Sequence, residues 1–490
     1  MKLTIEQINK LKEYGFITQV DPSNDILSHS IDTVELGKIW KYINQTDRTE
    51  IIEEWLNNGP TPSKNYLTFD ILSNGKIYWV TTMDGTGSHE SDYYKKTIQY
   101  SKDGGNTWTP ITSSILDPEA ISDVSYIEVS TGDTLLVKGN NSSYADAEME
   151  EDFYASTQFI ATSDFTPEAT PTLFNIRGNI MSLIGGDDFD NLLSLNDSFT
   201  FSQLFSSNRG LIDASQLILP ATTLADFCYN SMFSSCTSLT TAPALPATTL
   251  ARGCYSSMFG ECTSLTTAPT LPATTLADYC YDSMFFECTS LTTAPTLPAT
   301  TLVSNCYSSM FNGCTSLVTA PEILATTVAE GADGSCAVMF MNCTSLTTVP
   351  SLHITDLSGS TGCYKQMFEG CNSLTTAPSL PATTLANNCY AYMFEGCTSL
   401  TTAPAISAYE LPEGCCEHMF QNCTSLNHVT LDIEYWQSSS TYYWLDNVSP
   451  TGTFVGSAAV IDAWDQDRNR SGIPAGWTTE IIQSNDAPEV

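Results

Sequence analysis

The residues best suited to chemistry in this 490-residue chain are 17 cysteines, all of which lie between Cys228 and Cys423. Thiols at regular spacing can hold a metal ion, form disulfides or fill an apolar interior. The recurring spacing is C-x7-C rather than the C-x2-C of zinc sites, and no histidine follows at a regular offset. Disulfide frameworks are typical of small secreted chains. Of the three alternatives, the sequence favours reduced thiols on the inner face of a repeated unit.

A second candidate is the acidic group Asp187, Asp188 and Asp190, which follows Gly185 and Gly186. Clustered carboxylates can bind calcium, but this spacing is not that of an EF-hand loop. We expect a solvated acidic turn, with a cation site as the sharper alternative.

The histidines show no catalytic spacing. None stands in an H-E-x-x-H pair, and neither a G-x-S-x-G nucleophile elbow nor a G-x-x-x-x-G-K-[ST] phosphate loop occurs in the chain. We therefore expect neither enzymatic activity nor a bound cofactor. The five histidines are His29, His89, His353, His418 and His428.

Residues 431–490 are rich in aromatic side chains, which suit contacts with sugars or proteins as well as a core. We expect this segment to cap the end of the preceding repeats, with ligand binding as the alternative. The candidate ligand-binding aromatics are Tyr435, Trp436, Tyr442, Tyr443 and Trp444.

The charge of the chain limits its partners. Lysine and arginine number 18 against 55 aspartates and glutamates, a formal net charge of -37. Phosphate groups repel such a surface, so we expect neither nucleic acid nor a membrane as partner. No apolar run approaches the length of a membrane span, and the first residues lack the apolar core of a signal peptide. The expectation is a chain that is kept in the cell that makes it or assembled there into a particle.

A sequence repeat contains the cysteines and determines how they are placed in the fold. One phrase, CYNSMFSSCTSLTTAPALPATTLA with its variants, returns eight times. The steps between its second cysteines are 26, 26, 26, 29, 28, 26 and 26 residues. A fixed period in this range predicts a solenoid, in which each unit buries its apolar side by stacking on its neighbours. These second cysteines are Cys236, Cys262, Cys288, Cys314, Cys343, Cys371, Cys397 and Cys423.

Within a unit, the spacing by four of Leu224, Cys228, Met232 and Cys236 predicts an apolar stripe along a short helix. A glycine such as Gly313 would end that helix in a left-handed cap. The Leu-Thr-Thr-Ala run that follows predicts a short strand, closed by proline and paired in parallel with the next unit. The expected architecture is an α/β solenoid.

The core of the unit reads MFSSCTSL, MFGECTSL, MFFECTSL, MFNGCTSL, MFMNCTSL, MFEGCNSL, MFEGCTSL and MFQNCTSL. With a later Leu-Pro, it resembles the BspA-like leucine-rich repeats over about residues 200–430. That family is found in surface proteins of gut Bacteroidetes and in virion fibre proteins of Bacteroides phages, including crAss-like phages. The resemblance implies a repeat fold, and one such scaffold hosts many binding roles.

Around the repeats, hydrophobic periodicity and turn signals predict a multidomain, mostly β fold with some α. Residues 101–108 read S-x-D-x-G-x-T-W and resemble the Asp-box hairpin of sialidases, remote from catalysis. The expected parts are a helical domain at 1–58, a linker at 59–65, an immunoglobulin-like β-sandwich at 66–185, the leucine-rich-repeat solenoid at 186–430 and a cap at 431–490.

The helical domain carries apolar residues at helical spacing, which would form an anchoring face buried by another protein; a small independent helical bundle is the alternative. These residues are Leu36, Ile39, Trp40, Ile43, Ile51 and Trp55.

The resemblance and the modular order lead to a functional expectation. The chain would be a non-enzymatic head fibre or capsid decoration on a virion surface, attached to capsid or tail proteins by its N-terminal region. Its solenoid would bind a host-surface or mucus glycan, or a protein receptor, weakly and many times. The resemblance implies a homodimer or homotrimer. A tail fibre or receptor-binding protein and a bacterial cell-surface adhesin are the alternatives.

Overall fold

The chain forms two compact units, residues 1–65 and residues 66–490. The expected helical anchor, with its six apolar residues, lies outside the residues that the structure describes. No helix in the described part is long and apolar enough to cross a bilayer. The computed structural model describes residues 64–84, 94–116, 124–148, 153–166, 168–436, 438–464 and 472–482.

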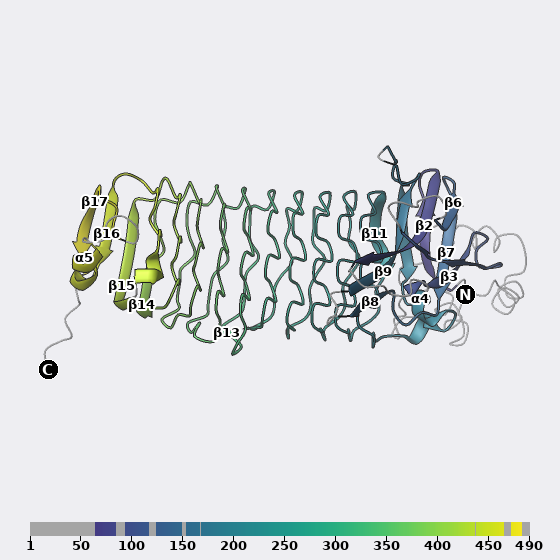
Figure 1. The fold of residues 1–490 in the computed structure, drawn as a ribbon, viewed down its shortest axis with the longest axis horizontal. Coiled ribbons are helices and arrows are strands. Elements are labelled where there is room, and N and C mark those ends of the chain that lie inside the picture. The colour runs from purple at the N-terminus through teal and green to yellow at the C-terminus, as the bar shows by residue number, and fades with distance from the viewer. Residues whose placement is uncertain are drawn as a thin grey trace, which may run out of the picture. The chain divides into compact units, whose positions relative to one another are not determined.

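Two β-sheets form the N-terminal part of the second unit (Figure 1). The rings of Phe69 and Phe159 meet between the sheets, 5.0 Å apart. The first sheet has the order β11-β10-β1-β7-β3-β4, with bounds Leu211–Ile218, Phe174–Asn179, Leu67–Ile71, Thr134–Gly139, Thr97–Ser101 and Thr109–Thr112. The second has the order β5-β2-β9-β8, with β6 also beside β2, and bounds Ser114–Ile115, Gly75–Asp84, Phe153–Thr162, Ala145–Glu148 and Tyr126–Val129.

Both sheets are mixed. The pairs β10–β11 and β2–β5 are parallel, whereas immunoglobulin-like sandwiches are built from antiparallel strands. The structure therefore gives a β-rich domain, but the expected immunoglobulin-like topology is not confirmed. Strand β11 lies beyond the expected boundary at residue 185 and completes the first sheet, so the β-rich domain and the repeats share one fold.

The Asp-box motif forms the expected hairpin between the antiparallel strands β3 and β4. The carboxylate of Asp103 accepts hydrogen bonds from the hydroxyl of Thr107 at 2.6 Å and from its N–H at 2.9 Å. The hydroxyl of Ser101 donates to the same carboxylate at 2.7 Å. These bonds, led by the Thr107 hydroxyl, lower the pKa of Asp103 to about 2.

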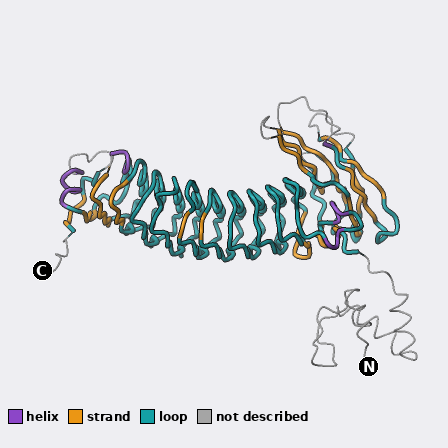
Figure 2. Tube along the Cα trace, turned by 90° about the horizontal axis from the view of Figure 1, so that it is seen from below, coloured by secondary structure: helices purple, strands orange, loops and turns teal. Residues whose placement is uncertain are grey.

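A short helix, α4 (Ser182–Gly185), and a 3-10 turn, η3 (Phe189–Asn191), lead into a stack of coils. Residues 192–436 are described throughout and contain no α-helix; Figure 2 draws them mostly as loops and turns. Within the turn segment of each unit, left-handed φ angles recur at a spacing of four residues, as at Phe227 (54°), Ser231 (52°) and Ser235 (60°). The helix expected in each unit is therefore wrong, because a right-handed helix excludes this conformation. The spacing by four instead reflects a ribbon of four-residue turns.

Hydrogen bonding accounts for the turns. The N–H of Met232 closes a turn on the carbonyl of Tyr229 at 3.2 Å, and the next N–H, of Phe233, donates to Met258 in the following coil at 2.9 Å. A helix would use both groups internally and leave the coils joined by side chains alone. The ribbon turns two residues of every four inward, and the buried set in one coil is Cys228, Tyr229, Met232, Phe233 and Cys236.

Two exposed ladders of mostly threonine pairs run along the stack, and the extended residues in them bridge in parallel, as expected. These contacts are mainly single bridges such as Thr267 to Thr293; longer pairing joins β12 (Thr301–Leu302) to β13 (Thr327–Val328). The first ladder comprises residues 240–241, 266–267, 292–293, 318–319, 347–348, 375–376 and 401–402. The second ladder comprises residues 222–223, 248–249, 274–275, 300–301, 326–327, 355–356 and 383–384.

A column of fully buried phenylalanine rings forms the core of the coil stack. Successive rings lie 5.5–5.8 Å apart with interplanar angles of 2–10°. At its first ring the column stacks on Phe159 of β9 at 5.7 Å, so the core continues into the β-rich domain. The column consists of Phe205, Phe233, Phe259, Phe285, Phe311, Phe340, Phe368, Phe394 and Phe420.

The regular column ends at a tryptophan in the C-terminal residues. Trp444 is buried with its ring 6.2 Å from Phe420 at 57°, so the regular stacking ends there. Helix α5 (Ala458–Trp464) and the 3-10 turn η4 (Ser438–Thr441) accompany a parallel sheet at this end (Figure 1). Its order is β14-β15-β16-β17, with bounds Ile406–Leu411, His428–Trp436, Gly452–Gly456 and Trp477–Ile481.

One left-handed position offers a test of the turn ribbon. Val338 has a φ of 61°, which a β-branched side chain strongly disfavours. We expect Val338→Gly to raise the free energy of unfolding by roughly 0.5–1 kcal/mol, whereas a substitution by glycine usually lowers it. Urea denaturation would measure it. Ala337→Gly is the control and should destabilise; a loss of stability in both variants would contradict the assigned backbone.

Candidate binding surface

The second cysteine of each coil is a hydrogen-bond donor to an earlier coil. The Sγ of Cys288 lies 3.0 Å from the carbonyl oxygen of Phe259, which also accepts the N–H of Cys262 at 3.1 Å. The thiol thus occupies the second lone pair of a buried carbonyl. Sequence reasoning treated these cysteines as apolar and missed this role. The same Sγ contact, at 3.0–3.1 Å, is made by Cys236, Cys262, Cys288, Cys314, Cys343, Cys371, Cys397 and Cys423.

All 17 cysteines are free and buried. Two sulfur pairs are in contact, Cys389 with Cys415 at 3.5 Å and Cys415 with Cys416 at 3.7 Å, and both distances are well beyond a disulfide bond. Burial raises the pKa of thiols such as Cys254 to about 12. Because the thiolate is the nucleophile, these thiols are poor reagents in the folded protein.

The three acidic residues near residue 187 differ in their contacts. The carboxylate of Asp187 bonds to the ammonium of Lys138 at 2.9 Å and accepts the hydroxyl of Tyr66 at 2.5 Å. Burial and this contact raise the pKa of Tyr66. Asp188 and Asp190 are exposed. Nowhere in the described ranges do three His, Cys, Asp or Glu residues stand together where they could hold a metal ion.

The structure separates the five candidate aromatics. Trp444 is fully buried, so its expected role in ligand binding is wrong: it closes the phenylalanine column instead. Tyr442 and Tyr443 lie together, 4.3 Å between ring centroids, and Tyr443 lies 5.2 Å from His418. Tyr435 is 56% exposed. The side chain of Trp436 lies outside what the structure describes.

Tyr435 has a partner that sequence reasoning missed. Its ring centroid lies 5.1 Å from that of Tyr409, with a tilt of 51°, and Tyr409 is 62% exposed. Tyr409 is one 26-residue step beyond Thr383, so it follows the second ladder. The missed signal was this substitution of tyrosine for threonine at a fixed place in the repeat.

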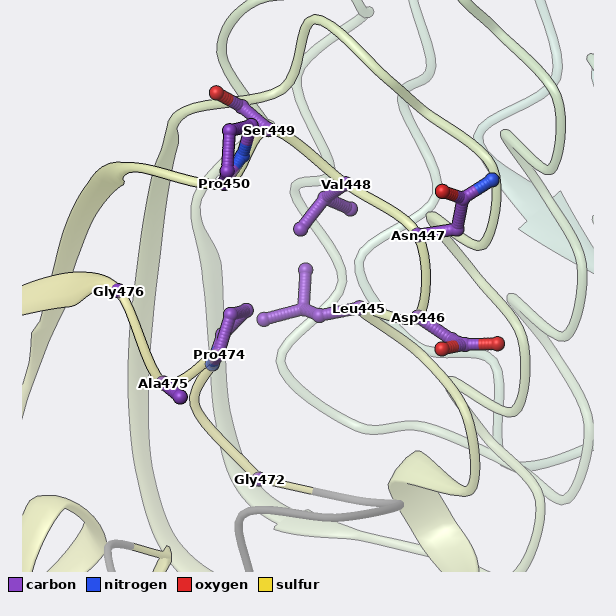
Figure 3. Close-up of a pocket in the computed structure, with 10 residues that line it drawn as sticks. All are labelled: Leu445, Asp446, Asn447, Val448, Ser449, Pro450, Gly472, Pro474, Ala475 and Gly476. Atoms are coloured by element: carbon purple, nitrogen blue, oxygen red, sulfur yellow. The ribbon is translucent and has the colours of Figure 1, made fainter.

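The pocket in Figure 3 has a volume of about 330 Å³ and lies beside the cap. Leu445, Val448 and Pro474 point toward one another in it, while Asp446 and Asn447 point away from them. The side-chain amide of Asn447 donates to Asn422 at 2.9 Å, and Asp446 accepts from Gln421 at 3.2 Å. These polar groups therefore join coils rather than converge on a ligand.

A half-buried acid in the ribbon gives a pH-dependent prediction. Burial raises the pKa of Asp282 above 3.8, although the hydroxyls of Ser256 and Ser283 bond to it. The folded state thus binds this proton more tightly than the unfolded state does. The contribution of Asp282 to the free energy of unfolding is present below pH 3.8 and is lost as the pH rises through the folded pKa. We expect Asp282→Asn to stabilise the protein at pH 7 but not at pH 3. Urea titrations at both values would show this. The exposed Asp278→Asn controls for overall charge, and equal gains in both variants would contradict it.

Geometry and charge define the class: an acidic protein of stacked coils with two exposed hydroxyl ladders, the second of which ends in tyrosines. The model of the BspA type leucine rich repeat region matches six copies, over residues 215–326 and 336–444. This part of the chain is therefore a BspA-type leucine-rich repeat region, as its motif indicated. Such repeats indicate a binding or adhesion role. No curated protein matches the chain.

Proposed function

We propose that this protein is a non-enzymatic adhesion component of a phage virion: a head fibre or capsid decoration that displays its coils toward the host. It is made in the host cytoplasm and attached through residues 1–58 to capsid or tail proteins. The BspA-type repeats support the adhesive part of this proposal. The net charge of -37 supports partners other than nucleic acid and membrane.

One observation carries the binding role: two ladders of exposed hydroxyl groups repeat along the coils. Between Cys228 and Cys423 the only lysine or arginine residues are Arg252 and Lys365, so charge cannot dominate recognition. Hydroxyls such as those of Thr301 and Thr327, 2.9 Å apart, can donate and accept bonds at one repeated spacing. Each contact is weak, and many copies on a particle convert weak binding into avidity. Host-surface and mucus glycans are ligands of this kind.

The location is tested on native particles. Gold-labelled antibodies raised against the full chain should decorate the capsid, and deletion of residues 1–58 should abolish incorporation of the chain. Normal loading of the deleted chain would overturn the anchor. Label confined to the tail would assign a tail fibre, and label on bacterial cells alone would assign a cell-surface adhesin.

Binding is tested with the full chain as it is purified and after display in many copies on streptavidin-coated particles. A homodimer or homotrimer should bind host capsular polysaccharide or mucin weakly, and the display should strengthen binding about a hundredfold or more. Light scattering would establish the oligomer first. Failure of the displayed form on every host glycan would leave the coils as a spacer.

A further inference from the structure

The second ladder changes its chemistry in the last coils. Its exposed pairs are Thr-Thr in most coils, but Tyr409 and Glu410 stand in the places of Thr383 and Thr384. One coil further on, Tyr435 lies beside Glu410 in the parallel register of β14 and β15. The second ladder therefore ends in two exposed aromatic rings next to a carboxylate.

The fold does not require these rings. Tyr409 is the most exposed of the large hydrophobic residues that the structure describes. Threonine serves the same backbone position in the preceding coil, so neither strand propensity nor core packing explains the change. The inward side of β14 and β15 is filled by Ala408, Leu411 and Ile433, which are buried. The rings thus stand on a supported sheet and face outward.

We propose that Tyr409 and Tyr435 form an aromatic platform that binds one sugar unit of a neutral glycan, a site that rests on the proposed adhesive function. The apolar C–H face of a pyranose can bury against tyrosine rings, and its hydroxyls can donate to the carboxylate of Glu410. The preceding residues of the second ladder, Thr383 and Thr384, offer hydroxyl groups to the next sugar units.

Size and charge select this ligand. Two tyrosine rings offer far less area than the roughly 800 Å² per partner that a stable protein interface buries, so a small unit fits better than a folded protein. The exposed polar neighbours on the two strands include Glu410 and Asp432, and the whole chain is acidic. Sulfated, sialylated or uronic glycans would be repelled, which leaves neutral sugars.

The test uses the full chain displayed in many copies and five probes: neutral dextran, neutral mannan, host capsular polysaccharide, desialylated mucin and anionic heparin. We expect binding to at least one neutral probe and none to heparin. Capsule and desialylated mucin distinguish a bacterial from a mucosal source.

Tyr409→Ala and Tyr435→Ala should each weaken this binding about tenfold, whereas Tyr409→Phe should retain most of it. Glu410→Gln should cost less than either alanine variant.

The matched control is Tyr126→Ala in β6, which removes another exposed tyrosine far from β14 in the sequence and should leave binding unchanged. Thermal unfolding would confirm that each variant is folded. If the wild type binds and the double variant Tyr409→Ala/Tyr435→Ala binds equally, the platform is wrong but the adhesive function stands. If the wild type binds no glycan, both are wrong. Preference for heparin would overturn the neutral ligand.

Discussion

Replacing Phe285 by alanine is expected to lower the free energy of unfolding by about 3–5 kcal/mol. The side chain is fully buried in the phenylalanine column, with neighbouring rings at 5.8 Å on one side and 5.6 Å on the other. Alanine would leave a cavity that the coils cannot close, because backbone hydrogen bonds on both sides fix their spacing. The N–H of Phe285, for example, donates to Met310 in the next coil at 2.9 Å. Urea denaturation followed by circular dichroism would measure the loss.

The adjacent Phe286 is a matched control in the same coil. Its side chain is half-buried and belongs to the outward pair of the turn, so Phe286→Ala should cost much less. Because stability in a repeat array depends on contacts between neighbours, the Phe285 variant should also unfold less cooperatively. Equal losses in the two variants would contradict the buried column as the main source of stability.

The repeat, its period and its dependence on stacking could be predicted from the sequence, because identical residues return at fixed steps. The secondary structure within the unit could not. Cys228, Met232 and Cys236 at spacing four fit a helix and a four-residue turn equally well. The left-handed residues that distinguish the two include serine, glutamate and phenylalanine as well as asparagine and glycine, so residue type alone does not mark every such position. Hydrogen bonds between coils decide the conformation, and they appear only when the coils are stacked.

The candidate site was predicted in part. Aromatic composition pointed to the cap but could not separate Trp444, which the phenylalanine column buries, from Tyr435, which the sheet exposes. The difference depends on which residue follows Phe420 in the column. The step from Phe420 to Trp444 is 24 residues rather than 26, and this change obscures the alignment. Tyr409 could have been found by aligning the coils, because tyrosine there replaces an exposed threonine.

The thiols should give the largest chemical contrast between the folded and unfolded protein. Burial raises the pKa of Cys236 and Cys288 to about 12, which reduces the reactive thiolate at pH 8 roughly a thousandfold relative to an ordinary cysteine. The coils also exclude the reagent, since every cysteine is buried. Titration with an aromatic disulfide reagent at pH 8 should therefore detect almost no thiol in the native protein.

The same titration after denaturation in urea, without any reductant, should count close to all 17 cysteines. Each second cysteine donates its S–H to a phenylalanine carbonyl, and oxidation would remove that donor and leave a buried oxygen short of one bond. The native hydrogen bonds therefore require reduced thiols. The midpoint of urea unfolding should not shift when a reductant is added. A denatured count near one would mean eight disulfides. A native count near 17 would instead mean that the coils open readily, and either result would overturn the closed stack of reduced coils.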